Sequence, residues 1–272
     1  MALSYFVCTN CGYWQQRYAA PESCPVCLDV RHVPPENGWE FLMPQEIDDR
    51  AESRWEEVEE GIWRFTVNPT LGIGPVGYLI VRPEGNVAFE GADWYSDAAL
   101  DHIDSLGGVR YVVPSHPHAQ GALWRLQERF GAEGAVQRED LVWVSTLRVG
   151  LPFDERQELL PGLTLRHVGG HFDGQSMLHH EAAGQLFVGD ALKVELEEDN
   201  KTAYALSCHK AFVRRIPLTH AEVAGYRKVY ESLDFSGVFT TFEQGKNVGR
   251  AEVLKLLDYL LQTKPTMEPM PL

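Results

Sequence analysis

The chain has 272 residues, of which 24 are Lys or Arg and 39 are Asp or Glu, so its formal net charge is −15 with histidine neutral. This acidic balance excludes a duplex nucleic-acid binder, which needs a basic surface to displace counterions from phosphates. With 44% hydrophobic and 11% aromatic residues, the composition indicates a globular protein and excludes disordered, collagen-like and coiled-coil chains.

No apolar stretch approaches the roughly 18 to 20 residues of a membrane span. The first residues lack the basic start and the long apolar run of a secretory signal. We therefore expect a cytoplasmic protein with neither a membrane nor a nucleic acid as its partner.

The cysteines are the first functional signal, because four of the five fall within the first 27 residues. Cys8 and Cys11 form one CxxC pair, Cys24 and Cys27 form a second, and twelve residues separate the pairs. Two tight turns that each present two thiolates complete a tetrahedral four-sulfur metal site. A segment this short cannot bury enough apolar surface to fold alone, so the ion is expected to act as its core.

The sequences of the two turns, CTNCGY and APESCPVC, resemble the short rubredoxin-like module of rubrerythrins. The resemblance permits iron as well as zinc. Zinc, which needs no redox role, is the first choice for a structural site, and iron would imply electron transfer. The spacing of the cysteines leaves the two metals open.

Residues 29–60 combine several prolines with an acidic run, which predicts an extended connection followed by a polar helix or linker. The run at 46–60 has eight acidic and two basic residues, net −6, and a second run at 195–199 has four acidic residues, net −4. Both are predicted to be solvated. The domain boundary is expected near residues 45–50, which gives a knuckle module with its linker at 1–45 and a larger domain at 46–272.

From residue 61 onward, short apolar runs typical of strands alternate with helical spacing. Strands are expected at 62–67, 78–81, 87–89, 109–113, 163–168, 177–180, 186–188 and 238–242. Helices are expected at 97–106, over the spacing of Leu123, Leu126 and Phe130, and at 221–233 and 247–261. Mixed hairpins and βα units of this kind predict an α/β sandwich in which helices cover sheets.

Three segments of the larger domain carry candidate metal ligands. His116 and His118 follow an apolar run, and in an extended segment residues i and i+2 project to the same side. His171 follows two glycines, which let a loop approach a buried point closely. Asp190 ends another apolar run, where an unpaired carboxylate is costly. Ends of strands are where α/β proteins usually place their ligands.

The order of these motifs resembles the metallo-β-lactamase superfamily over about residues 60–265. The first motif of that family, HxHxDH, is matched by His116 and His118, its GH turn by His171 and its strand-end GD by Asp190. The resemblance implies an αββα metallo-β-lactamase-like sandwich, so the full fold class expected is α/β, this sandwich with a small N-terminal metal-knuckle module.

The chain also departs from the family pattern. Gln120 and Gly121 stand where the motif has Asp and His, and only Glu243 or Gln244 is offered near the place of the last family histidine. A binuclear site is therefore not expected. His116, His118 and His171 are left to hold a single zinc or iron, with Asp190 as a further ligand or as the base.

Three neutral imidazoles and an open position suit a catalytic zinc. We therefore expect hydrolysis of a small ester, thioester or related substrate. Two alternatives stay open. The first alternative is an iron oxidoreductase that receives electrons from the rubredoxin-like centre. His116, His171 and Asp190 make the two-histidine, one-carboxylate set of mononuclear iron enzymes, and persulfide dioxygenases of the same fold use similar positions. The other alternative is a non-catalytic binding protein.

Lys210 lies in a small basic cluster after the run that ends at Asp190. In this superfamily that region recognises substrate, so Lys210 is a candidate to bind an anionic group of a small-molecule substrate. Cys208 is expected to be a small buried residue. The knuckle could stiffen the N-terminus, cover the active site or form a homodimer contact, and the sequence leaves these three roles open.

Overall fold

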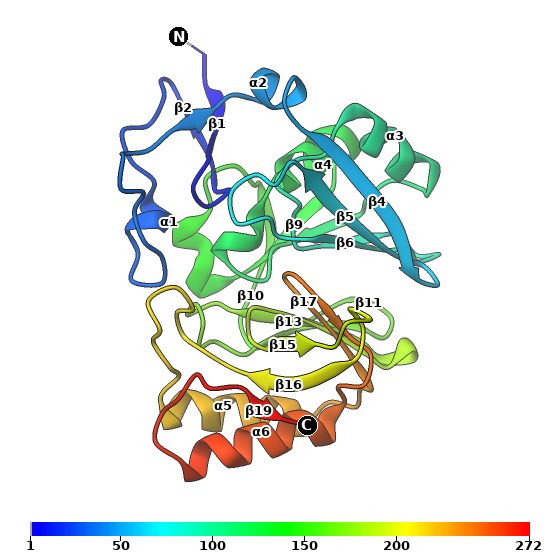
Figure 1. The fold of residues 1–272 in the computed structure, drawn as a ribbon. Helices are drawn as coiled ribbons and strands as arrows, with labels where there is room; N and C mark the ends of the chain where they lie inside the picture. Colours follow the sequence, from blue (N-terminus) through cyan, green and yellow to red (C-terminus); the bar gives the residue numbers. More distant parts are fainter. Residues whose placement is uncertain (1) are drawn as a thin grey trace. The chain divides into compact units, whose positions relative to one another are not determined.

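A computed structural model describes residues 2–272, and the chain divides into two compact units (Figure 1). Unit 1 comprises the residues up to 136 together with 141–152, and unit 2 comprises 137–140 and 153–272. The knuckle therefore shares a unit with the sheet that follows it in sequence. The expected boundary at residue 45 is untested as a folding boundary and stays a prediction.

The knuckle is built on a three-stranded antiparallel sheet with the strand order β2-β1-β3. Its elements are β1 (Ser4–Cys8), β2 (Trp14–Arg17), helix α1 (Pro25–Leu28) and β3 (Phe41–Leu42). The first CxxC pair begins at the end of β1 with Cys8, and the second begins with Cys24, directly before α1. The short helix α2 (Pro44–Asp48) follows.

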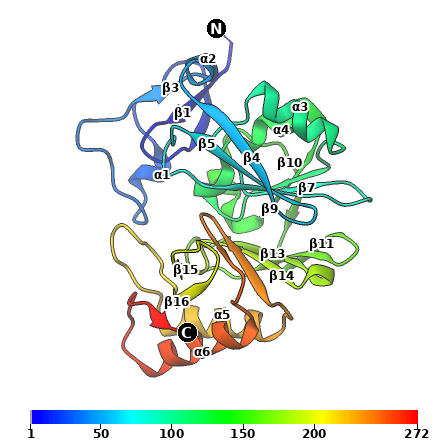
Figure 2. The same ribbon diagram turned by 45° about the vertical axis from the view of Figure 1, so that its right-hand side comes forward.

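The rest of unit 1 is a seven-stranded sheet with the strand order β10-β9-β8-β7-β6-β5-β4. The strands are β4 (Glu52–Glu59), β5 (Ile62–Asn68), β6 (Gly77–Ile80), β7 (Val87–Phe89), β8 (Tyr111–Val113), β9 (Glu133–Gln137) and β10 (Val149–Phe153). Its helical elements are α3 (Asp97–Ser105), η1 (Pro117–Gln120), α4 (Leu123–Phe130) and η2 (Arg138–Trp143). Residues of α3 and α4 share one apolar core with β6, β7 and β8, so both helices pack on one face of the sheet (Figure 2).

The acidic run at 46–60 was wrongly predicted to be a polar helix or linker. Most of it is β4, the edge strand that pairs antiparallel with β5. The strand forms because Trp55 stacks on Phe65 and on His102, while most of its acidic side chains face solvent. Acidic side chains on an edge strand also discourage pairing with another chain.

Unit 2 contains a six-stranded sheet with the order β11-β12-β13-β14-β17-β18 and a three-stranded sheet with the order β15-β16-β19. The strands are β11 (Arg156–Leu160), β12 (Leu163–His167), β13 (Ser176–His180), β14 (Gln185–Gly189), β15 (Lys193–Leu196), β16 (Ala203–Ser207), β17 (Gly237–Thr240), β18 (Gln244–Gly245) and β19 (Met270–Pro271). The helical elements are η3 (Glu181–Ala183), α5 (His220–Glu231) and α6 (Arg250–Gln262), and α5 and α6 lie side by side (Figures 1 and 2).

The two long helices of unit 2 cover its apolar core. Val223, Tyr226 and Tyr230 of α5 are buried together with Leu256 and Leu257 of α6. The core also takes apolar residues from β14 and β16. The mixed α/β class expected from the sequence is confirmed, and each unit has helices packed on a sheet. The last expected strand, at 238–242, is shorter in the structure, and β19 after the last helix was not expected.

Within residues 2–272, no helix is long and apolar enough to cross a membrane.

Candidate metal centres

The four knuckle cysteines converge on one point. The Sγ atoms of Cys8, Cys11, Cys24 and Cys27 all lie within 4.8 Å of one another, and all four residues are fully buried. The Cys8–Cys27 and Cys11–Cys24 sulfur pairs are each 3.6 Å apart. A tetrahedral ion with metal–sulfur bonds of about 2.3 Å separates its sulfurs by roughly 3.8 Å. The donor set therefore fits a tetrahedral zinc or iron, and the separations are too long for disulfides.

Hydrogen bonds among the four thiols shift their pKa values in opposite directions, lowering those of Cys8 and Cys27 and raising those of Cys11 and Cys24. Hydrogen bonds, first from Cys11 and then from Cys24, hold the pKa of the Cys27 thiol far below its usual range. The same two neighbours lower the pKa of Cys8. Asn10 Nδ2 donates a further hydrogen bond of 3.3 Å to Cys27 Sγ. Thiolates are the form that binds a metal, and the convergence of four buried sulfurs makes the knuckle a metal-binding site.

His116 and His118 form the candidate pair of unit 1. Both are almost fully buried, and their rings meet edge to face with centroids 5.4 Å apart. His116 has an extended backbone, but Pro117 begins η1, so the expected fully extended segment is instead a strand end followed by a 3₁₀ turn. The Ala119 carbonyl accepts a hydrogen bond of 2.9 Å from the N–H of Gly91, the residue after Glu90. This bond joins the turn to the segment that carries Glu90.

A buried carboxylate and a hydroxyl support His116. Ser115 Oγ lies 2.7 Å from His116 Nδ1 and donates a hydrogen bond of 2.5 Å to Glu90 Oε1. The same carboxylate oxygen is 3.9 Å from His116 Nδ1. Glu90 adopts a left-handed backbone with φ of +59°, which is uncommon for a residue other than glycine and clusters at functional sites. Contacts of this kind to the second ring nitrogen orient a metal-binding histidine.

Gln120 and Gly121 are built into the structure in roles other than metal binding. Gln120 Nε2 donates to the carbonyl of Trp143 over 3.3 Å. Gly121 has φ of +41°, and a Cβ there would lie 2.2 Å from the Gly91 carbonyl oxygen. No side chain can replace this glycine without moving the backbone. The two motif positions that would supply the second pair of ligands are therefore occupied by a hydrogen-bonded glutamine and a tightly packed glycine.

His171 and Asp190 form the candidate pair of unit 2. His171 Nε2 lies 3.4 Å from Asp190 Oδ2, and both side chains are largely buried. The turn before His171 packs on Tyr226, whose hydroxyl donates to the Gly169 carbonyl over 3.0 Å. Gly170 has φ of +82°, and a Cβ there would lie 2.5 Å from the Tyr226 ring. Both glycines of the turn are in left-handed conformations, as close approach requires.

Glu243 lies near this pair but is engaged by its own turn. Its Oε2 accepts a hydrogen bond of 2.7 Å from Thr240 Oγ1, whose oxygen in turn accepts from Glu243 N–H. Burial raises the pKa of the Glu243 carboxyl, and the charge of Asp190 acts in the same direction. The Glu243 carboxylate is therefore held by its own turn, and Gln244 is buried in β18.

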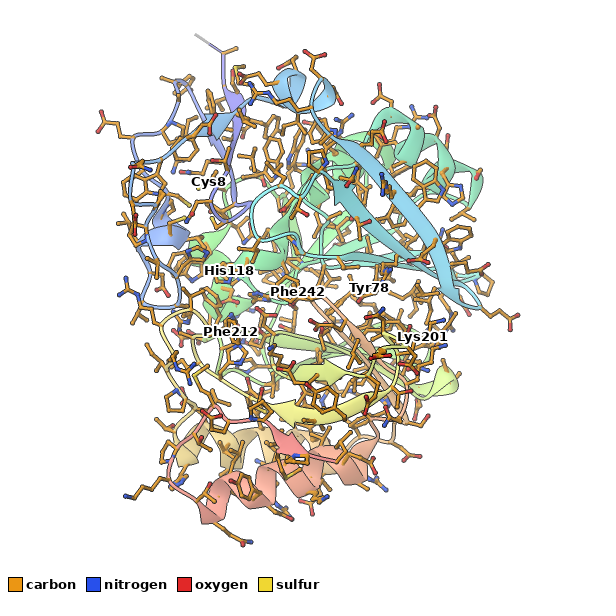
Figure 3. All side chains as sticks on the ribbon, viewed as in Figure 1. Cys8, Tyr78, His118, Lys201, Phe212 and Phe242 are labelled. Atoms are coloured by element: carbon orange, nitrogen blue, oxygen red, sulfur yellow. The ribbon has the colours of Figure 1, made fainter. Side chains whose placement is uncertain are left out.

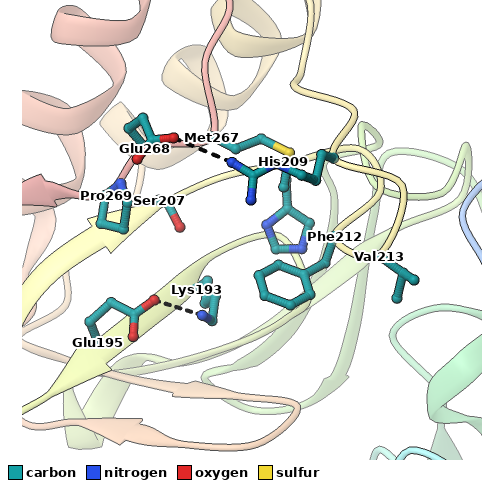
Figure 4. A pocket seen from close by; sticks show the side chains of 10 residues that line it. Lys193, Glu195, Ser207, His209, Phe212, Val213, Met267, Glu268 and Pro269 are labelled. Atoms are coloured by element: carbon teal, nitrogen blue, oxygen red, sulfur yellow. Dashed lines mark hydrogen bonds and ion pairs between the residues drawn. The ribbon is translucent and has the colours of Figure 1, made fainter.

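A pocket of about 470 Å³ adjoins the unit 2 pair (Figure 4). His209 connects the two, since its ring lies 5.9 Å from that of His171 and 5.3 Å from that of Phe212 in the pocket wall. Burial lowers the pKa of His209, and the charge of Asp190 opposes that shift. The other lining residues are Lys193, Glu195, Ser207, Val213, Arg215, Met267, Glu268 and Pro269.

Charges in the pocket wall occur in pairs. Lys193 Nζ lies 2.6 Å from Glu195 Oε1, and Arg215 Nη2 lies 3.4 Å from Glu268 Oε1. Lys210, the candidate expected from sequence, is not among the residues that line this pocket, and its ammonium is 2.7 Å from Glu222 Oε1. Cys208 is fully buried, as expected.

Sequence reasoning missed several residues around these pairs. Glu90 and Ser115 contact His116, His209 contacts His171, and His32 contacts His118. Ser115 and His209 adjoin motifs that were recognised, so their positions were available as a signal. Glu90 and His32 are far from His116 and His118 in sequence, and no local pattern distinguishes them.

Comparison with known proteins supports both modules. Residues 6–29 match the family model of the rubrerythrin rubredoxin-like domain. The chain is 26% identical over 251 residues to YmaE of Bacillus subtilis (strain 168), a protein described as uncharacterized, and the match spans 89% of this chain and 90% of that protein.

Solved metallo-β-lactamases share the fold. DIM-1 has a TM-score of 0.56 and 14% identity over 76% of this chain and 97% of its own. FIM-1 from Pseudomonas aeruginosa, in a mono-zinc form, has a TM-score of 0.55 and 14% identity over 77% and 95%. The Hirschia baltica enzyme has a TM-score of 0.53 and 18% identity over 77% and 97%. The chain thus combines a metallo-β-lactamase fold with a rubredoxin-like module, and both resemblances expected from sequence are confirmed.

Proposed function

We propose that the protein is a metal-dependent hydrolase of a small ester, thioester or related substrate. His116, His118, His171 and Asp190 would hold one metal ion. The observation that carries this proposal is the pair of buried imidazoles, His116 and His118, supported through Ser115 by a buried carboxylate, in a fold that metallo-β-lactamases also have.

The donor chemistry fits such an ion. Three imidazoles and a carboxylate are a ligand set that zinc accepts, and iron accepts two of the imidazoles with the carboxylate. When bound, the metal would polarise the carbonyl of the substrate and make water a better nucleophile. Of the chain's own groups, Asp190 would accept a proton or orient the attacking molecule, and its nearness to His171 supports this role, with 3.4 Å between Oδ2 and Nε2.

The first motif supports a mononuclear site. The positions that would hold a second ion are Gln120, which donates to a backbone carbonyl, and Gly121, which has no room for a side chain. Two-metal hydrolysis requires both ions within about 4 Å. We therefore propose one ion per chain in the histidine site.

The pocket beside His209 supports a small substrate with a polar end. Phe212, Val213 and Met267 offer apolar surface, whereas Lys193 and Arg215 offer cations. An anionic group entering this pocket would compete with Glu195 and Glu268 for those cations. Lys210 remains a candidate to bind the anionic group of the substrate. To do so it would have to leave its ion pair with Glu222.

Hydrolysis by the metal-loaded chain tests the proposal. Purified protein, with its metals quantified, is assayed on a panel of small esters and thioesters. Asp190→Asn should lower kcat by about 10²-fold or more, since removing a proton-transfer group costs this much. Glu243→Gln is a matched neighbouring control and should retain most activity. A wild-type chain whose histidine site stays empty in excess zinc would contradict the proposal, as would equal activity in Asp190→Asn.

An iron oxidoreductase is the second candidate, and the match of residues 6–29 to the rubrerythrin rubredoxin-like domain favours it. Metal analysis of protein purified from cells grown with both metals separates the two. Iron at both the cysteine and the histidine sites would support redox chemistry, and zinc at both would support hydrolysis.

A further inference from the structure

The knuckle contributes a histidine to the neighbourhood of the unit 1 pair. His32 follows α1, is 7% exposed, and its ring lies 5.5 Å from the ring of His118 at an interplanar angle of 65°. This spacing matches the 5.4 Å between His116 and His118. His118 therefore contacts two imidazoles, one from its own motif and one from the cysteine module. Figure 3 labels His118 and, in the cysteine module, Cys8.

The position of His32 depends on the cysteine site. Asn10 Nδ2 donates both to Cys27 Sγ, over 3.3 Å, and to the Val33 carbonyl, over 3.1 Å. Val33 N–H lies 2.8 Å from His32 Nδ1 and donates to it, and His32 N–H donates to the Asp29 carbonyl over 3.1 Å. One amide side chain thus joins a cysteine ligand to the loop that carries His32.

A second connection joins the knuckle to the turn that carries His118. The Tyr13 hydroxyl and Gln120 Nε2 both donate to the carbonyl of Trp143. Tyr13 follows the Cys8–Cys11 pair by two residues, and Gln120 ends η1. The cysteine site and the His118 turn therefore share an acceptor, in addition to the His32 contact.

An aromatic cluster keeps the knuckle in place. Trp14 packs on Trp94 and Trp124, with ring centroids 5.6 and 5.3 Å apart, and its Nε1–H donates to the Asp93 carbonyl. Tyr5 stacks on Trp124 at 3.9 Å. Trp124 belongs to α4, which follows η1 directly, so the knuckle is anchored on the element next to the histidine turn.

From these contacts we infer that His32, in the loop that follows α1, is a positioning residue of the histidine site. It fixes the ring of His118 in the orientation that binds the ion, and so couples the metal affinity of the histidine site to the integrity of the cysteine site. This inference rests on the proposed function, because it requires that His118 binds a metal. The coupling is reciprocal, as linkage between two binding sites must be.

The test is a cobalt titration of the full chain with its cysteine site already loaded with zinc. Visible bands of Co²⁺ report the histidine site, and sulfur-to-cobalt charge-transfer bands would reveal exchange at the cysteines. His32→Ala should weaken Co²⁺ binding about 10- to 100-fold, the usual effect of losing a residue that orients a ligand, and should shift the Co²⁺ bands. His32→Phe, which keeps an aromatic ring, should restore most of the affinity.

Val33→Ala is the matched control in the same loop and should bind Co²⁺ as the wild type does. Unchanged affinity and bands in His32→Ala would overturn the inference and leave the proposed hydrolase intact. A wild-type chain that binds Co²⁺ at the histidine site yet hydrolyses nothing would overturn the hydrolase while the inference stands. A histidine site that binds no Co²⁺ in the wild type would overturn both.

Discussion

Asp93 is a buried carboxyl that lies against the first cysteine turn of the knuckle. Its carboxyl is fully buried in unit 1, and a Cβ on Gly12 would lie 2.2 Å from Asp93 Oδ1. Burial raises the pKa of Asp93 well above its usual range, and a backbone N–H from Gly74 opposes this only in part. Burial therefore favours the neutral, protonated form of this carboxyl over the charged form.

The raised pKa predicts an unusual pH dependence of stability. The folded chain holds a proton on Asp93 that the unfolded chain releases above about pH 4, so the free energy of unfolding should fall as pH rises from there through the folded pKa. Asp93→Asn removes this titration, and its stability relative to the wild type should increase as the pH rises from about 4 towards the raised folded pKa. Urea unfolding of the zinc-loaded chain measures it. Asp101→Asn, an exposed carboxylate, is the control, and parallel profiles for wild type and Asp93→Asn would contradict the assignment.

At the scale of elements, helix starts are where local sequence and fold agree best. Helix α5 begins with a capping box, in which Thr219 Oγ1 accepts from Glu222 N–H and Glu222 Oε2 accepts from Thr219 N–H. Glu222 also receives the Lys210 ammonium. This capping turn therefore has two roles. It starts the helix that carries Tyr226, on which the turn before His171 packs, and it pairs with Lys210, the cation expected from sequence to bind substrate.

Removing the cap should destabilise unit 2 by a known amount. Thr219→Ala is expected to lower the free energy of unfolding by about 1 kcal/mol, the typical cost of losing an N-cap hydroxyl. Thr219→Ser keeps the hydroxyl and should stay within a few tenths of a kcal/mol of the wild type. Urea denaturation followed by circular dichroism compares the three chains. Equal losses in the Ala and Ser variants would show that the cap hydrogen bond is not the cause.

At the scale of the whole molecule, the chain relies on metal where apolar surface is scarce. The knuckle core consists of the four cysteines with Tyr13 and Val26, and partly buried aromatic residues pack around it. The three strands also place Val7, Trp14 and Leu42 in the unit 1 core, so the ion is expected to hold chiefly the two cysteine turns. The larger cores of unit 1 and unit 2 are apolar and require no metal.

Removing the cysteine-bound metal should therefore lower the melting temperature. An ion present at about 1,000 times its dissociation constant contributes about 4 kcal/mol, which corresponds to roughly 10 °C for a chain of this size. Tryptophan fluorescence should change as well, because Trp14 packs on Trp94 and Trp124. Calorimetry with and without a strong chelator measures the shift. Cys27→Ser should show little further change with chelator, and an unshifted wild type after metal loss would refute a structural role.

Much of the fold was predictable because its signals are local. Apolar runs placed eight strands, β5 to β8, β12 to β14 and β17, and the helices α3 to α6 within a few residues. The two glycines before His171 indicated a close approach of the backbone, and the structure shows both to be left-handed. The run at 46–60 failed because local charge indicates exposure, and exposure is compatible with an edge strand as well as with a linker. What decided it was the pairing of β4 with β5, a partner outside the run.

By itself the sequence determined the metal-binding residue types and their order, since CxxC spacing and the histidine motifs are set by the reach of a few consecutive side chains. The tertiary structure alone decided which remote groups support them. Glu90 reaches Ser115 across 25 positions, and His32 reaches His118 from a different module. Such contacts depend on how strands and turns pack, because burial and ring orientation are properties of neighbours in space rather than along the chain.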